Sequence, residues 1–254
     1  MDKFDNRAAK YTSTRVGLFD LASTQIPQAR FLERECAIAR LKLKENIKFC
    51  DISAGSGYLA DGVFESLNGN VDITCIENSQ AFVDILKKKY FVIKSSLSNI
   101  LVPNQEFDRV GCLAGIHHQQ NKLAFYKEAF RILKFGGILV IGDVLEESPP
   151  AQFLNNPVDY YSDIGHDGMF IREDEVSQQL EEVGFINVTE KVEYYTWNFP
   201  DEPSMISYCK NLFRMTKATL NEVYQVIFEY LPVTQDSAGV HLHWQLLFVT
   251  AQKL

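Results

Sequence analysis

Short apolar segments alternate with amphipathic segments over roughly the first 150 residues. The apolar segments, rich in β-branched residues, lie near 46–52, 71–77, 90–94, 107–115 and 136–144. Between the last two, Tyr126, Ala129, Phe130 and Leu133 recur at helical spacing. Such alternation predicts crossover units and a parallel sheet with helices on both faces. The unbroken apolar character of the strands is typical of strands covered on both faces.

The second half of the chain has a different pattern. Residues 145–170 carry three prolines and resemble a loop, and a helix is expected from about 172 until Gly184 ends it. A strand is predicted at 185–199 and a final one at 241–252. Between them, two amphipathic helices are predicted from apolar stripes. These stripes are Met205, Ile206, Cys209, Leu212 and Phe213, then Leu220, Val223, Tyr224, Ile227, Phe228 and Leu231.

The N-terminal residues before the first strand are more polar. Residues 27–43 predict a helix with Leu32, Cys36 and Ala39 on one side, and residues 2–25 predict an irregular or short-helical flap. We therefore expect an N-terminal flap and helix at 1–45. One domain would follow at 46–254, with cap elements at about 146–171 and 200–232.

The composition of the chain limits the kinds of binding partner that we expect for the protein. The net charge is −8, which argues against the basic face of a nucleic-acid binder. No apolar run reaches the roughly 18 residues that cross a bilayer, and the start resembles no secretion signal, so we expect a cytoplasmic protein without a membrane partner. The five scattered cysteines lack metal-binding spacing, and no metal site is expected. The sequence makes no prediction of oligomeric state.

The stretch FCDISAGSGYLADGVFE, Phe49 to Glu65, combines a strand end, a turn of small residues and a helix start. Glycines there let a ligand approach the backbone, where the helix directs free N–H groups at it. Asp51 can accept hydrogen bonds from a ligand ammonium, and Glu77 ends the next strand, where a carboxylate suits ribose hydroxyls. These features predict an adenosine-containing cofactor. Spacing alone leaves a nicotinamide cofactor open, since Ala60 fits the looser dinucleotide pattern.

The order of several motifs settles on one family. After the glycine turn and Glu77 come FDRVGCLAGIHHQQN, EAFRILKFGGILVIGDV and GFINVTE. In this order, from about residue 46 to 192, the chain resembles the class I S-adenosylmethionine-dependent methyltransferases. The resemblance implies a Rossmann-like, seven-stranded, mostly parallel α/β sheet with an antiparallel last strand and a helical cap insertion. It implies S-adenosyl-L-methionine as the cofactor.

The resemblance also assigns roles to residues. Asp51, Gly55 and Gly57 would line the methionine part, Glu77 the ribose and Asn78 the adenine side. Leu113, Ala114 and Gly115 would flank the sulfonium. The remaining cofactor-binding residues that we expect are Tyr11, from the closing flap, Ala54, Ser96 and Leu97. Three departures are visible: Ser53 stands where the family usually has its first glycine, Phe135 replaces the proline common before the next glycine pair, and serines replace the usual acidic residue near Ser96.

His118 and His117 are the candidate catalytic bases. They follow the fourth strand, at the edge where open α/β sheets bind ligands, and their segment resembles one that supplies a base in some family members. A packing or hydrogen-bonding role beneath the cofactor is the alternative, favoured for His117. His166 and Asp167 are interpreted as residues of a solvated loop.

The acceptor is expected to be a small molecule, free or held by a carrier protein, and most simply methylated on a carboxylate or hydroxyl oxygen. Aromatic residues near the predicted cap suit a planar or apolar acceptor. They are Tyr194, Tyr195, Trp197, Phe199 and Tyr208. The layout further resembles the malonyl-carrier-protein and trans-aconitate methyltransferases. The alternatives are a non-catalytic or regulatory protein that keeps the fold, and a nicotinamide-dependent oxidoreductase.

Overall fold

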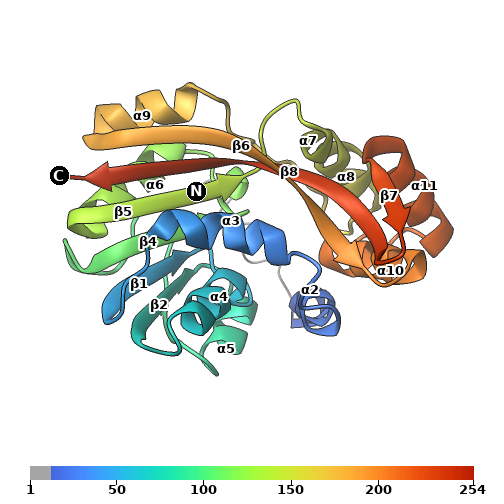
Figure 1. Ribbon diagram of the computed structural model, residues 1–254, viewed down its shortest axis with the longest axis horizontal. Coiled ribbons are helices and arrows are strands. Elements are labelled where there is room, and N and C mark those ends of the chain that lie inside the picture. The colour runs from blue at the N-terminus through green and yellow to red at the C-terminus, as the bar shows by residue number, and fades with distance from the viewer. Residues whose placement is uncertain (1–12) are drawn as a thin grey trace.

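The centre of the molecule is a single sheet of eight strands (Figure 1). The structure is a computed structural model, and it describes residues 13–254. Along the sheet the order is β3-β2-β1-β4-β5-β8-β6, with β7 paired to β8 off this path. The strands are β1 (Ile47–Ile52), β2 (Val71–Glu77), β3 (Phe91–Lys94), β4 (Phe107–Leu113), β5 (Leu133–Asp143), β6 (Phe185–Phe199), β7 (Val233–Asp236) and β8 (Gly239–Lys253).

The first five strands are parallel, and β8 runs antiparallel to both β5 and β6. This confirms the expected α/β sheet with its antiparallel last strand. All seven expected strands are present. The eighth, β7, was not expected, because it is a four-residue edge strand with three exposed residues and almost no apolar pattern.

Helices cover both faces of the sheet. On one face α3, α4 and α5 share an apolar core with the inner strands, and on the other α6 and α9 form a second core. A further helix, α2, packs against α5 and against α10 (Glu202–Leu212). The bounds are α2 (Ser13–Gln25), α3 (Phe31–Leu41), α4 (Tyr58–Ser66), α5 (Gln80–Leu86), α6 (Lys122–Ile132) and α9 (Glu175–Val183). A 3₁₀ turn, η1 (Ile116–His118), follows β4.

Helix α3 does not bury the face that its apolar pattern indicated. Leu32 is 40% exposed, whereas Glu33 and Arg34 are buried with Ala37 and Leu41. The reason is electrostatic, because Glu33 pairs with Arg30 and accepts hydrogen bonds from two buried aromatic side chains. A charge that is paired and hydrogen-bonded can be buried at a tolerable cost.

The long strands β6 and β8 build the second half of the molecule. From residue 247 onward β8 pairs with β5, but its first half pairs only with β6 and β7. This extension of the sheet carries the cap seen to the right in Figure 1. The cap contains α7 (Pro149–Phe153), the π-helical turn η2 (Leu154–Val158), α8 (Asp159–Tyr161), α10 (Glu202–Leu212) and α11 (Leu220–Tyr230).

The interpretation of residues 145–170 as a loop is wrong for its middle. Residues 149–161 are helical despite their prolines. Pro149 and Pro150 occupy the first helical turn, where no N–H is required, and the Ser148 hydroxyl caps it by accepting from Ala151 N. The two amphipathic helices are confirmed, although Leu220 and Phe228 of α11 are 57% and 41% exposed.

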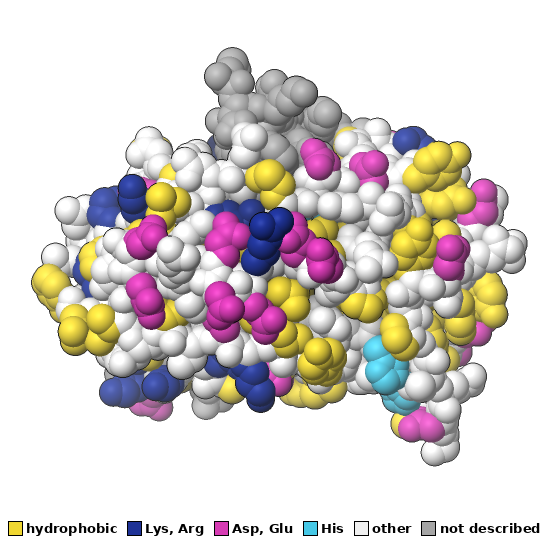
Figure 2. All heavy atoms as spheres, turned by 90° about the horizontal axis from the view of Figure 1, so that it is seen from above, with side chains coloured by type: hydrophobic (Ala, Val, Ile, Leu, Met, Phe, Trp, Pro, Cys, Tyr) yellow, Lys and Arg dark blue, Asp and Glu magenta, His cyan; other side chains and the backbone are white. Residues whose placement is uncertain are grey.

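The surface is mixed in charge on the side that Figure 2 presents. Lys and Arg side chains alternate there with Asp and Glu, and apolar side chains gather toward the end that bears the cap. Among the described helices, none is both long and apolar enough to cross a membrane. The cytoplasmic location stays a prediction.

Candidate active site

A cavity lies at the carboxyl ends of β1, β2 and β4 and extends toward the cap. It brings together most of the residues that the sequence selected. These are Asp51, Ala54, Gly55, Glu77, Asn78, Ser96, Leu97, Leu113, Ala114, Gly115, His117 and His118. The carboxyl edge of a parallel sheet is where ligands bind in open α/β folds.

The turn between β1 and α4 explains why small residues recur at every second position. Ser53, Gly55 and Gly57 all have positive φ, at 60°, 56° and 94°. Glycine adopts this left-handed backbone without steric cost. Ser53 is the one residue of the three whose side chain disfavours that conformation.

The three positions serve different purposes. Gly55 lines the cavity, as expected. Gly57 lies outside the lining and instead caps α4, where an added Cβ would approach Leu86 at 3.1 Å and Tyr90 at 3.3 Å. Its small size therefore serves helix packing. Tyr11, the flap residue expected over the cofactor, lies outside the described residues.

Asp51 is a buried carboxyl at the end of β1. Its Oδ2 accepts a hydrogen bond from Ala60 N at 3.0 Å, within α4. Burial raises the pKa of Asp51 to about 8, although that hydrogen bond opposes the shift. A cation placed beside it would favour the ionised form, so the site suits an ammonium.

Glu77 ties the end of β2 to the glycine turn. Its Oε2 accepts from Gly55 N at 3.0 Å, and its Oε1 accepts from Asn78 N and Ser79 N at 2.8 and 2.9 Å. Burial raises the pKa of Glu77, and the three backbone N–H groups oppose that rise. A carboxylate offers about two acceptor positions on each oxygen, so Oε1 is already filled by its two N–H donors and Oε2 remains able to accept from a ligand hydroxyl.

The cap side of the cavity is aromatic. Trp197 of β6 and Trp244 of β8 stack with ring centroids 4.5 Å apart, and Phe213 packs on both. Arg214, with 9% of its surface exposed, also lines this half. Trp197 Nε1 donates to Glu33 Oε2 at 3.0 Å, so the aromatic wall is fixed to α3.

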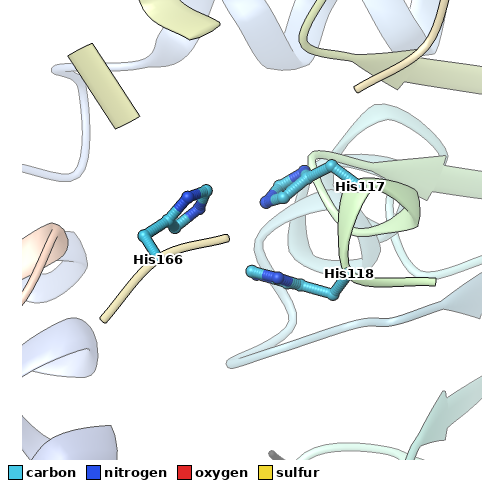
Figure 3. Close-up of side chains that lie close together, drawn as sticks. All are labelled: His117, His118 and His166. Carbon is cyan, nitrogen blue, oxygen red and sulfur yellow. The ribbon is translucent and has the colours of Figure 1, made fainter. Parts of the chain in front are cut away.

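The two predicted histidines lie in η1 and line the same cavity (Figure 3). His117 is buried, and its Nδ1 lies 2.7 Å from Asp143 Oδ1 at the end of β5. His118 is half-buried beside it, with ring centroids 4.1 Å apart.

The interpretation of His166 as a solvated loop residue is wrong. It is 7% exposed, lines the cavity and points at the other two histidines (Figure 3). Its Nδ1 lies 3.0 Å from Asn155 Oδ1 of η2. The loop bends inward because its hydrogen bonds reach η2 and η1, an arrangement that local composition does not encode.

Sequence reasoning missed much of the remaining lining. Some of these residues precede the first strand, where no pattern pointed to a ligand, two lie in α4 and α5, and others lie in or beside the cap. They are Phe19, Arg30, Glu33, Tyr58, Phe82, Phe213, Arg214 and Trp244. No sequence signal indicated Arg30 and Glu33, because the apolar pattern placed the buried side of α3 at Leu32, Cys36 and Ala39.

The strand order, the antiparallel strand β8 and the acidic ends of β1 and β2 define a class I methyltransferase fold. A family profile described as a methyltransferase domain matches residues 27–190, and the chain belongs to this family. The expected family is thus confirmed, and S-adenosylmethionine is the cofactor that it implies.

Curated relatives have similar sequences. The chain is 32% identical over 127 residues to a ubiquinone/menaquinone biosynthesis C-methyltransferase UbiE of Neisseria meningitidis, covering 47% of this chain and 51% of the relative. It is 24% identical over 156 residues to the Coxiella burnetii protein of that name, covering 58% of each. The chain thus spans about half the length of the curated relatives it matches.

Solved structures share the fold. One is an S-adenosylmethionine-dependent methyltransferase of Thermotoga maritima, with 19% identity and a TM-score of 0.61, covering 94% of this chain and 98% of that one. Another is the Haemonchus contortus phosphoethanolamine N-methyltransferase 2 in complex with S-adenosyl-L-methionine, with 15% identity and a TM-score of 0.61 over 100% of this chain and 60% of that one.

Proposed function

We propose that the protein is an S-adenosylmethionine-dependent methyltransferase that methylates an oxygen atom of a small, largely apolar molecule. One observation carries the proposal: a single cavity joins the acidic strand ends and glycine turn to a buried aromatic and histidine-lined half. A methyl donor and an acceptor could lie in these halves in contact, which an in-line displacement requires.

In the cofactor half, we place the ammonium of the methionine part at Asp51 and the ribose at Glu77. Both carboxyls are buried and lie at neighbouring strand ends, since Asp51 pairs with Cys75, two residues before Glu77. Ser96 and Leu97 would flank the adenine. Leu113, Ala114 and Gly115 would then face the sulfonium, because they follow β4, the other neighbour of β1.

In the acceptor half, Trp197, Trp244 and Phe213 offer flat apolar faces, and Arg214 offers the charge for an anionic group. Aromatic walls with a few polar groups are typical of small-molecule sites. The acceptor would therefore be planar or apolar, with its nucleophilic oxygen directed at η1.

The histidines supply the chemistry that such an oxygen needs. A hydroxyl must lose its proton as the oxygen–methyl bond forms and the carbon–sulfur bond breaks, whereas a carboxylate needs no base. His118 and His117 lie where that proton would be released. Asp143 holds the His117 ring in place, as an orienting carboxylate holds a catalytic base.

Carbon methylation is the second candidate, favoured by the printed name of the curated relatives, C-methyltransferases of quinone biosynthesis. A phenol-like acceptor that loses its hydroxyl proton becomes nucleophilic at a ring carbon as well as at oxygen. The same cavity suits either product, and the acceptor's structure decides between them.

The test begins with cofactor binding by calorimetry, using S-adenosylhomocysteine. The protein is then incubated with S-adenosylmethionine carrying a deuterated methyl group and a metabolite extract, and products are sought by mass spectrometry. A labelled O-methyl ether or ester supports the proposal, and a carbon-bound label selects the second candidate. Cofactor binding without any labelled product favours a protein that keeps the fold without the transfer, and absent binding removes the proposal altogether.

A further inference from the structure

We propose that His117, His118 and His166 form a binding site for a divalent transition-metal ion, such as Zn²⁺, at the acceptor end of the cavity. One ring nitrogen of each lies within 4.8 Å of the others. Figure 3 shows the three rings converging from two separate segments, η1 and the loop that follows α8. Nitrogens bound to one tetrahedral zinc would lie about 3.3 Å apart, so a small side-chain adjustment closes the site.

The tautomer of His117 is fixed by its neighbour. Asp143 accepts from the backbone N–H groups of Ile116 and His117 at Oδ2, and from Val144 N at Oδ1. A carboxylate engaged in this way acts as an acceptor, so the His117 Nδ1 at 2.7 Å is the donor. The proton on Nδ1 leaves the Nε2 lone pair for a ligand. A carboxylate behind a histidine is the common outer partner of a metal-binding imidazole.

The tautomer of His166 is fixed independently. The Asn155 amide is oriented by Gly168, whose N–H donates to Asn155 Oδ1 at 2.8 Å and whose carbonyl accepts from Asn155 Nδ2 at 2.8 Å. The atom facing His166 Nδ1 is therefore the amide oxygen, an acceptor, and Nδ1 carries the proton. Again Nε2 is left as the ligand nitrogen. Two of three rings are thus held in the form that metal binding requires.

Packing of aromatic rings is a competing explanation for the cluster. Aromatic packing favours offset-stacked or edge-to-face pairs, and His166 does stack on Phe170 at an interplanar angle of 20°. The three histidine rings are tilted by 32° to 60° to one another, which suits nitrogens aimed at a common point. The acceptors behind two of the rings satisfy buried N–H groups, and they also hold both rings in the tautomer that binds a metal.

The chemistry of the ligands indicates the class of metal. Three imidazoles without a carboxylate suit Zn²⁺ and its transition-metal neighbours and do not suit Mg²⁺ or Ca²⁺, which prefer oxygen. Three protein ligands also leave a position open, as catalytic zinc sites do. Here that position faces the cavity. Resting on the proposed function, a metal held here would orient the acceptor oxygen toward the methyl donor and favour loss of its proton. In the metal-bound form the histidines would be ligands, so the proton would pass to solvent and not to His117 or His118. No sequence pattern predicted this metal site, because His166 is far from the other two histidines along the chain.

Metal binding itself is the test, made without cofactor or acceptor. Tag-free full chain, stripped with a chelator, is titrated with Co²⁺ and followed by visible absorption, then with Zn²⁺ in competition. We expect one equivalent of Co²⁺ with bands of a low-coordinate centre, displaced by Zn²⁺. His166→Gln and His118→Gln should each weaken binding at least 10-fold. Asn155→Leu, which removes only an outer partner, should weaken it by about 10- to 100-fold.

The control is His241→Gln, since His241 lies on β8 and bonds to Asn198 and Asp236, outside the cluster. It should bind Co²⁺ as the natural chain does. Circular dichroism establishes that each variant is folded, and two ligand variants guard against one failing to fold. No saturable binding by the natural chain, or binding that survives both ligand variants, overturns the site. Binding of S-adenosylhomocysteine, measured separately, tests the proposed function and does not depend on this result.

Discussion

The side chain of Ser53 occupies the space above Gly115 where a Cβ would lie. An ideal Cβ on Gly115 would be 2.6 Å from both Cβ and Oγ of Ser53. The two residues belong to different turns, after β1 and after β4, and both line the cavity where we place the sulfonium. The side chain of Ser53, the residue that departs from the family pattern, thus fits beside position 115 because Gly115 has no Cβ.

Gly115→Ala should therefore destabilise the fold, and Ser53→Gly should rescue it. Gly115 has a φ of −131°, so alanine brings a steric clash without backbone strain. Overpacking typically costs about 1–3 kcal/mol in the free energy of unfolding. In urea titrations the double variant should recover most of that loss, because Ser53 provides both contacts shorter than 3 Å.

Gly17→Ala is the matched control for this pair, since a Cβ at Gly17 in α2 would meet no heavy atom within 4 Å. It should not lower stability, and it should raise the free energy of unfolding by up to about 1 kcal/mol, because alanine favours a helix interior over glycine. Equal destabilisation in the single and double variants would show that the contact between Ser53 and Gly115 does not determine the cost.

Asp51 should give cofactor binding a dependence on pH. Its pKa of about 8 means that it is mostly protonated at pH 7 in the free protein. Binding an ammonium beside it favours the carboxylate, so binding at pH 7 should release part of a proton. Calorimetry in buffers of different ionisation enthalpy measures this release, which should vanish in Asp51→Asn. Equal release from both proteins would contradict the placement of the ammonium.

The same group should lower stability as pH rises. Between its unfolded pKa near 4 and its folded value of about 8, the native state holds a proton that the unfolded chain has lost. Its contribution is therefore fully present below pH 4 and falls by up to about 1.4 kcal/mol per pH unit until pH 8. In urea titrations at pH 6 and 8, the free energy of unfolding of Asp51→Asn should increase relative to that of the natural chain as pH rises. A constant difference would show that the pKa is not raised.

Glu77→Ala should weaken S-adenosylhomocysteine binding by roughly 1–3 kcal/mol, because charged hydrogen bonds to the ribose are lost. It should also lower the midpoint of unfolding, since three backbone N–H groups lose their acceptor. Asp72→Ala, an exposed change on the same strand, serves as the control for both measurements. Unchanged affinity would mean that the ribose does not bind at Glu77.

Glu33→Ala should be among the most damaging changes. It would leave Arg30 buried without its ion-pair partner and remove the acceptor of the Tyr195 hydroxyl and the Trp197 ring N–H. Breaking a buried pair in this way costs about 3–5 kcal/mol. Glu35→Ala, on the same helix and only half-buried, should cost far less. Similar urea midpoints for the two variants would show that the buried pair contributes little.

The sequence predicted the parallel strands and the cofactor half because both depend on local patterns. Apolar runs mark the strands, and the ends of β1 and β2 place Asp51 and Glu77 side by side. The acceptor half could not be predicted in this way. Trp197 and Trp244 meet through the pairing of β6 with β8, and His166 reaches His117 only through a loop fixed by Asn155. Such contacts between distant segments produce no periodic pattern in the amino-acid sequence.

The continuity of β6 and β8 limits how the protein can open. Both strands run without a break from the sheet into the cap, paired along their length apart from a shift between Ile186 and Thr189. Swinging the cap as a rigid body would require tearing main-chain ladder bonds. Small molecules must therefore exchange through local rearrangement of elements outside the ladder, such as the segment that bears His166. That local rearrangement would then limit the rate of turnover.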